Sequence, residues 1–146
     1  MKSIRRAGLS LVGALALACT ATLGGTGTAQ AASGTKCSSW ANFSGSSALM
    51  RACINSGAGD YGWTEVYNPY PYTLTVGMMS KLYDMNWYEL THQDYYVWYT
   101  IGAGHYQTIT TPYVSDTRSG PESVGGWAKV LNSSTSGYAS VTENWT

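Results

Sequence analysis

The sequence carries little charge and no cluster of positive charge. Only 11% of its 146 residues are charged, and no basic run follows the first six residues. Nucleic-acid binding needs Lys and Arg to neutralise phosphates, and docking on an anionic membrane surface needs them for the lipid headgroups. The composition therefore argues against nucleic acid and against an anionic membrane surface as partners.

Residues that build metal or catalytic sites are also scarce. The chain has two histidines, and His92 with Asp94 could begin a metal site or a base–orienter pair, but no third ligand stands at a telling spacing. A surface histidine in a loop is the simpler interpretation. No Gly-x-Ser-x-Gly motif occurs, and no phosphate-binding glycine loop follows a strand. We therefore predict no catalytic residue, no metal and no cofactor.

Scattered carboxylates leave one enzymatic alternative open. Glu65 lies in a strand-like segment, and Asp84, Glu89 and Asp94 lie close together in the sequence. A glycoside hydrolase needs two carboxylates at a fixed separation in a cleft, which a sequence cannot show. A small extracellular hydrolase that uses Glu65 or the 84–94 carboxylates is therefore retained as an alternative.

The first 31 residues have the pattern of a secretory signal peptide. Lys2, Arg5 and Arg6 precede an uncharged apolar segment over 7–21, and Ala29-Gln30-Ala31 is a small-x-small cleavage site. The apolar segment is too short for a comfortable membrane span, so we expect no stable span after cleavage. Sec export is favoured over a twin-arginine signal, and a lipid-modified Cys19 is the weaker reading.

Cleavage after Ala31 changes both the charge and the cysteine count. Five of the eight basic residues remain with all eight acidic ones, so the remaining domain is mildly acidic. Of the three cysteines, Cys19 is removed with the leader, and Cys37 and Cys53 remain. Two cysteines in an exported domain are expected to pair, and closing so short a loop contributes on the order of 3 kcal/mol in the chain-entropy model.

The rest of the chain has the pattern of one all-β domain. We expect an extended, loosely structured N-terminal arm over 32–47, fixed by Cys37, and a single β-sandwich domain over 48–146. Residues 48–54 fit a first strand better than a short helix. The period-two alternation over 61–76, interrupted by Asn68-Pro69-Tyr70-Pro71, predicts a strand, a tight connection and a second strand that together form a hairpin.

Further strands follow from the same alternation. The second strand of the hairpin is expected to reach about Tyr83, followed by an irregular loop or helical turn over 84–92. The expected strands are 94–101, 106–114, 127–131 and 138–145, with a loop over 115–123 and a polar turn over 132–137. About seven short strands separated by turns predict a small Ig-like antiparallel β-sandwich with one disulfide.

Aromatic side chains are the strongest functional signal. The chain has six Trp and twelve Tyr but one Phe, and a core of this size cannot hold all of these rings. Any single ring has an even chance of being an ordinary core residue. Exposed Tyr and Trp combine an apolar ring with a polar tip, which suits protein interfaces and sugar stacking. The candidate binding residues are Trp63, Tyr67, Tyr70, Tyr72, Tyr96 and Trp98.

Two resemblances add expectations. Residues 95–146 include a Tyr-rich strand before His105, the Thr108-Ile109 strand, Gly126-Trp127-Ala128-Lys129 and a C-terminal strand that ends at Trp145. In these elements the segment resembles the C-terminal part of lactococcin 972-type bacteriocins, small exported β-sandwich proteins that act on cell-wall synthesis. That family is shorter, and the disulfide and the 61–76 segment lie outside the match.

The second resemblance covers the whole chain after the leader. It is carried by Arg51-Ala52-Cys53-Ile54, by Val66 to Pro69 and by the glycine-rich turn and Thr-rich strand over 102–111. In these features the chain is similar to small secreted actinobacterial proteins with Ig-like β-sandwiches. This resemblance implies a fold and an extracellular location more than a function.

Three functional hypotheses result. The leading one is a secreted, non-enzymatic interaction module that binds an extracellular protein or a cell-wall glycan through an exposed aromatic face, either alone or as a component of a larger secreted assembly. The first alternative is a secreted antibacterial effector that acts at the cell wall, as the bacteriocin resemblance implies. The second is the small hydrolase.

Overall fold

The structure is a computed structural model that describes residues 34–57, 59–93, 95–115 and 120–143. The expected signal peptide over 1–31, with Cys19, lies outside the described residues, and so do Asp94 and Trp145.

All regular structure in the described part of the chain is β-strand, which confirms the all-β prediction. The strands are β1 (Gly34–Cys37), β2 (Ala41–Asn42), β3 (Leu49–Ser56), β4 (Gly59–Tyr67), β5 (Leu74–Tyr83), β6 (Glu89–His92), β7 (Val97–Ile101), β8 (Tyr106–Thr110), β9 (Val114–Ser115), β10 (Ser123–Val130) and β11 (Ser136–Thr142).

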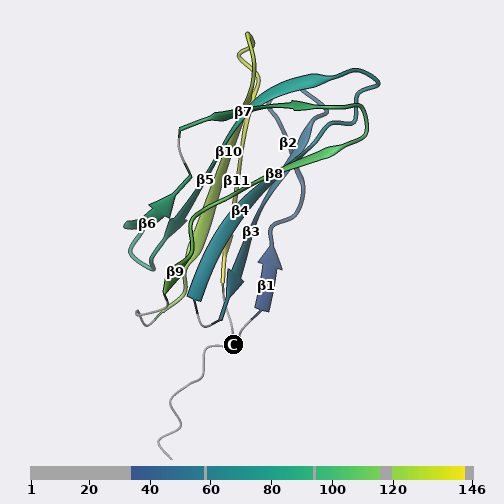
Figure 1. The fold of residues 1–146 in the computed structure, drawn as a ribbon. Helices are drawn as coiled ribbons and strands as arrows, with labels where there is room; N and C mark the ends of the chain where they lie inside the picture. The colour runs from purple at the N-terminus through teal and green to yellow at the C-terminus, as the bar shows by residue number, and fades with distance from the viewer. Residues whose placement is uncertain (1–33, 58, 94, 116–119, 144–146) are drawn as a thin grey trace, which may run out of the picture. The chain divides into compact units, whose positions relative to one another are not determined.

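The strands form two antiparallel sheets (Figure 1). Among the described residues, the first sheet has the order β1-β3-β4-β8, with β2 beside β3 and β9 beside β4. The second has the order β11-β10-β5-β6, with β7 also paired to β5. The two-sheet fold is thus confirmed, while its likeness to immunoglobulin domains stays a prediction.

The core lies between the sheets and follows the alternation along the strands. Met50, Ala52 and Ile54 of β3 point inward, as do Val76 and Met78 of β5, and all five are fully buried. Successive side chains of a strand point to opposite faces, so the residues between them face outward. Each sheet therefore has an outer face, on which exposed aromatic side chains can stand.

The hairpin prediction for residues 61–76 is wrong. Both strands exist, but β4 pairs with β3 and β8 in the first sheet, whereas β5 pairs with β10, β7 and β6 in the second. The segment between β4 and β5 therefore crosses from one sheet to the other. Asn68 is fully buried at this crossing, where its Nδ2 atom lies 2.8 Å from the Tyr72 carbonyl and 2.9 Å from the Ile101 carbonyl.

Hairpins occur elsewhere in the chain. β3 and β4 pair directly, and so do β10 and β11; the turn between these last two ends before Ser136, so it is shorter than the polar turn expected over 132–137. β10 begins at Ser123, four residues before the expected strand, and β11 covers Ser136–Thr142. The Gly125-Gly126 pair had obscured the start of β10 because glycine weakens a strand pattern.

Three further expectations need correction. The expected loop over 84–92 contains strand β6 from Glu89, and the strand expected from residue 94 begins at Val97. The strand expected over 106–114 is broken into β8 and β9, with Pro112 between them. The first two boundaries shifted because Trp87 and Tyr96 adopt left-handed backbone conformations, which composition does not mark, whereas the third break falls at Pro112.

The N-terminal arm is part of the first sheet. β1 and β2 both pair with β3, and Phe43 is buried in the core, so the expectation of a loosely structured arm is wrong over the described residues. The disulfide between Cys37 and Cys53 is confirmed, and it joins residues that are directly opposite each other in the β1–β3 pair.

Candidate functional site

Exposed apolar side chains gather on the second sheet. Among the described residues, ten large hydrophobic side chains are exposed, and seven of them belong to the second sheet or to the connections between its strands. A concentration of exposed apolar surface on one side of a domain marks an interaction site. The seven residues are Met85, Trp87, Tyr88, Tyr95, Trp98, Leu131 and Tyr138.

Trp98 lies flat on the second sheet because its neighbour is glycine. In the β5–β7 pair Trp98 is directly opposite Gly77. A Cβ atom added to Gly77 would lie 3.1 Å from Cη2 and Cζ3 of Trp98 and 3.2 Å from its Cδ2. Cη2 and Cδ2 are opposite corners of the six-membered ring, so near-equal distances mean that the ring lies parallel to the sheet surface. Trp98 as a whole residue is 44% exposed, and the other face of its ring points away from the sheet.

A second indole on this face also packs over a glycine. A Cβ atom added to Gly125 would lie 2.6 Å from Cη2 of Trp127 and 3.3 Å from Cε2 of Tyr83. Ring centroids are separated by 5.0 Å between Trp127 and Tyr138 and by 6.5 Å between Trp127 and Tyr83. These spacings are those of interacting aromatic pairs. Tyr138, Trp127 and Tyr83 therefore form a continuous row of rings across β11, β10 and β5.

The row continues to Trp87, whose ring centroid lies 5.6 Å from that of Tyr83. Trp87 has a φ of 63°, in the left-handed region that bulky residues avoid. Asp84 holds this turn in place, because its Oδ1 atom accepts hydrogen bonds from the backbone N–H groups of Asn86 and Tyr88, both at 2.9 Å. The turn thus keeps a strained tryptophan beside the other rings.

Tyr96, in the turn directly before β7, is a second strained aromatic residue, with a φ of 42°. Such a conformation costs on the order of 1–3 kcal/mol and is concentrated at functional sites. The Nζ atom of Lys129 lies 4.1 Å from the centroid of the Tyr96 ring and 5.5 Å from that of the Trp98 ring. Ammonium groups over ring faces are attracted by the negative faces of the rings.

A charged pair borders this aromatic surface. Lys81 Nζ lies 2.6 Å from Glu89 Oε2, and His92 Nδ1 lies 2.5 Å from Glu89 Oε1. The hydrogen bond from Lys81 lowers the pKa of the Glu89 carboxyl, and the same bond raises the pKa of the Lys81 ammonium. Glu89 therefore stays ionised at mildly acidic pH.

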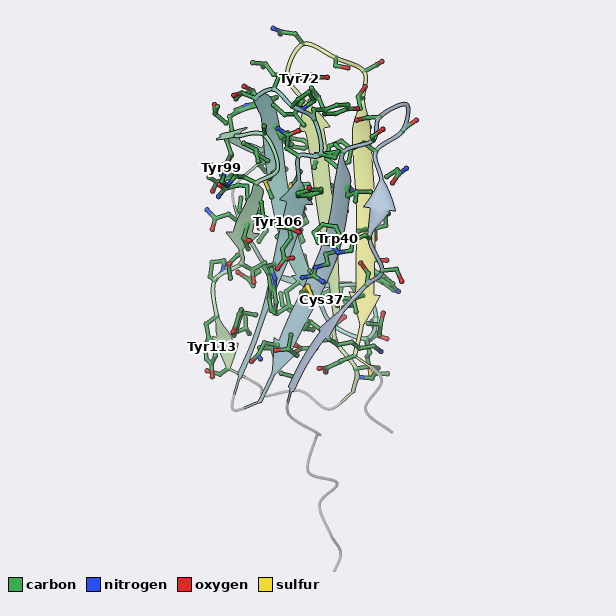
Figure 2. All side chains as sticks on the ribbon, turned by 90° about the vertical axis from the view of Figure 1, so that its right-hand side faces the viewer. Cys37, Trp40, Tyr72, Tyr99, Tyr106 and Tyr113 are labelled. Carbon is green, nitrogen blue, oxygen red and sulfur yellow. A yellow bond between two sulfur atoms is a disulfide. The ribbon has the colours of Figure 1, made fainter. Side chains whose placement is uncertain are left out.

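The outer face of the first sheet carries a different cluster, in which the polar groups satisfy one another. Glu65 Oε2 lies 2.6 Å from Arg51 Nε, and Glu65 Oε1 accepts a hydrogen bond of 2.8 Å from the Trp63 indole. The Arg51 guanidinium lies 4.6 Å over the Trp40 ring, which is 5.9 Å from that of Tyr106. Figure 2 shows Trp40 and Tyr106 on this sheet, with the disulfide at Cys37 close to them.

Tyr70 and Tyr72 lie in neither cluster. They stack on each other at a centroid distance of 5.0 Å in the crossing between β4 and β5, and Figure 2 places Tyr72 at one end of the sheets. The Tyr70 hydroxyl is 2.9 Å from Ser46 Oγ and accepts a hydrogen bond from the Ser47 N–H. The Ser46 contact lowers the pKa of the Tyr70 phenol. Tyr70 thus attaches the crossing to the N-terminal segment.

The structure divides the six candidate binding residues among three places. Trp63 and Tyr67 lie on the outer face of the first sheet, Tyr70 and Tyr72 in the crossing, and Tyr96 and Trp98 on the second sheet. They do not share one face. The row of rings that sequence reasoning missed consists of Tyr83, Trp87, Trp127 and Tyr138.

Glycine within a strand was the signal that could have found this row. Gly77 and Gly125 occupy central strands, where glycine often marks the close approach of another group. Here that group is an indole ring in both cases. The pairing of each glycine with its tryptophan depends on strand register, which the sequence does not show.

The titratable candidates have structural partners. Both carboxylate oxygens of Glu65 are engaged by Arg51 and Trp63, and His92 contacts Glu89. Within the described ranges, no group of three or more His, Cys, Asp or Glu side chains is arranged to hold a metal ion. No helix of the described residues is long and apolar enough to cross a membrane.

Neither the protein-family models nor the curated proteins include a significant match to this chain.

Proposed function

We propose that the chain is a non-enzymatic binding module that holds an extracellular glycan on the outer face of its second sheet. The observation that carries this proposal is the tryptophan that lies flat over Gly77, with a second indole over Gly125 beside it. A side chain at either glycine would lift the ring from the sheet. The sequence of the central strands thus favours ring faces that are open to a ligand.

A flat ring suits a sugar better than a protein anchor. The axial C–H groups of a pyranose form an apolar face that stacks on an aromatic plane, while its hydroxyls project around the rim. Protein interfaces instead concentrate binding energy in aromatic side chains that fill pockets. Outward-facing hydroxyls flank the rings on the neighbouring strands and can bond to sugar hydroxyls. They belong to Thr75, Thr100, Ser136 and Ser140.

An extracellular setting agrees with this proposal. The Cys37–Cys53 disulfide is a bond of oxidising compartments, and the leader pattern over 1–31 predicts export with cleavage near Ala31. The cell-wall glycan of the producing cell or of its neighbours is then within reach. An Ig-like fold remains part of the proposal on the resemblance to secreted actinobacterial proteins.

The other hypotheses predict different results. An extracellular protein partner, or another subunit of a larger secreted assembly, would bind the same rings. Such a protein would need pockets that receive them. An antibacterial effector of the lactococcin 972 type rests on the resemblance over 95–146, whose segments contribute to both sheets. A hydrolase that uses Glu65 would need this carboxylate released from Arg51 and Trp63, which engage both of its oxygens.

The test compares tryptophans on the two outer faces. The purified chain is assayed for retention on insoluble cell-wall polysaccharide and on a panel of soluble glycans by affinity electrophoresis. We expect Trp98→Ala and Trp127→Ala each to lower the affinity by roughly tenfold or more, which corresponds to about 1.4 kcal/mol. Trp63→Ala is the matched control, since it removes the same side chain from the other sheet.

Two outcomes would overturn the proposal. The first is retention that Trp63→Ala weakens as much as Trp98→Ala does, because binding would then not depend on the second sheet. The second is the absence of binding to every glycan tested by a chain that melts cooperatively. If the chain captures a single protein from the culture medium and the Trp98→Ala variant does not, the ligand is a protein and not a glycan.

A further inference from the structure

Lys129 stands at the centre of the aromatic surface without a carboxylate partner in the described part of the chain. Its ammonium contacts the faces of Tyr96 and Trp98 only through cation–π geometry. The other cations of the described residues have oxygen partners within 2.8 Å: Arg51 with Glu65, Lys81 with Glu89, and Lys36 with the carbonyl of Thr142.

We infer that the ligand is an acidic polysaccharide and that Lys129 binds its carboxylates; this inference rests on the proposed glycan-binding function. An ammonium has three N–H donors, and a ring face satisfies them less well than an oxygen does. A carboxylate that approaches from solvent gains a charge-assisted hydrogen bond with the ammonium, which is roughly twice as strong as a neutral one.

The charge of the surface agrees with an anionic ligand. At the border the charges of Lys81 and Glu89 cancel, while Lys129 places a positive charge at the centre of the aromatic surface. The chain after residue 31, by contrast, has five basic residues against eight acidic ones. The positive charge of Lys129 attracts an anion to this place, while the acidic excess of the rest of the domain repels it elsewhere.

Geometry links the charge to the stacking platform. Lys129 lies beside Gly77 in the β10–β5 pair, and Trp98 lies beside Gly77 from the other side in the β5–β7 pair. The ammonium lies over the Trp98 ring, 5.5 Å from its centroid, so it reaches the ring on which a sugar would stack. A uronic acid residue stacked on Trp98 can therefore direct its carboxylate toward Lys129.

The test uses polymers that differ in the carboxylate alone. Polygalacturonate, alginate and hyaluronan are each compared with their carboxyl-reduced derivatives, which keep the chain length and the ring shape. We expect the full chain to bind at least one parent polymer roughly tenfold more tightly than its reduced form. The difference should decrease as salt is added, because ions screen an exposed charge pair.

Variants at Lys129 separate charge from packing. Lys129→Met keeps the apolar stem and should bring the affinity for the acidic polymer down to that which the same variant has for the reduced polymer. Lys129→Arg keeps the charge and should retain the preference. Thermal melting of both variants shows whether the sheet surface is intact, and a Met variant that also loses the reduced polymer would assign Lys129 to packing and overturn the inference.

The failure of this inference differs from the failure of the proposed function. Equal affinity for the parent and reduced polymers, with binding still lost in Trp98→Ala, would overturn the acidic ligand and leave a neutral glycan. The same conclusion follows if none of the acidic polymers binds while neutral glycans do. If no glycan of either kind binds, the proposed function itself fails.

Discussion

Replacement of Asn68 by Ala tests the crossing between the two sheets. Asn68 directly follows β4 and is fully buried, and its side-chain amide lies within 3.1 Å of the carbonyl oxygens of Tyr72, Ile101 and Gly102. Its Oδ1 atom accepts a hydrogen bond of 3.1 Å from the Tyr70 N–H. One side chain therefore connects the first sheet, the crossing and the end of β7 in the second sheet.

The magnitude follows from counting donors. The Asn68 amide has two N–H groups, so it can make two full hydrogen bonds with the three carbonyl oxygens, and Oδ1 makes one more. Each contributes about 1 kcal/mol net, and their loss leaves buried backbone groups without partners, so Asn68→Ala should destabilise the fold by about 3 kcal/mol. For a domain near 100 residues this lowers Tm by about 12 °C or more.

Denaturant unfolding followed by tryptophan fluorescence measures this change. Asn42→Ala is the control, since Asn42 is exposed on β2 and should alter stability by less than about 0.5 kcal/mol. Asn68→Asp should be worse than Ala at neutral pH, because it places a carboxylate against carbonyl oxygens. Its folded pKa is then raised, so stability should return as the pH falls. A loss below about 1 kcal/mol for Asn68→Ala would refute the reasoning.

Three further predictions concern the disulfide, the ring platform and the charged border. Replacement of Cys37 and Cys53 by Ser should destabilise the chain by about 3 kcal/mol from loop entropy, which a comparison of reduced, oxidised and variant proteins in denaturant would reveal. Gly77→Ala places a methyl group 3.1 Å from the Trp98 ring and should weaken glycan retention with little change in Tm; unchanged retention would show that the flat ring is not needed. Because the pKa of Glu89 is lowered in the folded chain, its stabilisation is present above the ordinary pKa of 4.5 and is lost as the pH falls through the folded value. Glu89→Gln should thus be less stable than the unchanged chain near neutral pH, by under about 1 kcal/mol, and equal to it in acid.

The segment over 61–76 shows how far local pattern reaches. Alternation identified two strands and the prolines identified the break between them, and both were confirmed. The pairing of the strands was wrong, because period-two alternation states which side chains share a face and not which strand lies alongside. A hairpin and a crossing between sheets have the same pattern; the buried Asn68 and its bonds to Ile101 and Gly102 distinguish them.

The aromatic residues show the same limit for function. The sequence has more rings than a core can hold, and exposed rings are present in the structure. It grouped Trp63 with Trp98, yet these residues lie in different sheets. It also passed over Trp127, whose position over Gly125 depends on the packing of a ring against a neighbouring backbone.

The sequence alone determined the all-β class, the Cys37–Cys53 bond and the alternation that separates core residues from surface residues. These depend on nearby residues, on composition or on a count of cysteines, so no long-range information was needed. Only the tertiary structure decided which strands share a sheet and which glycine lies beneath which tryptophan. The register that brings Gly77 between Trp98 and Lys129 is set by the competing packing of whole strands, and that competition is resolved when the two sheets close over their core.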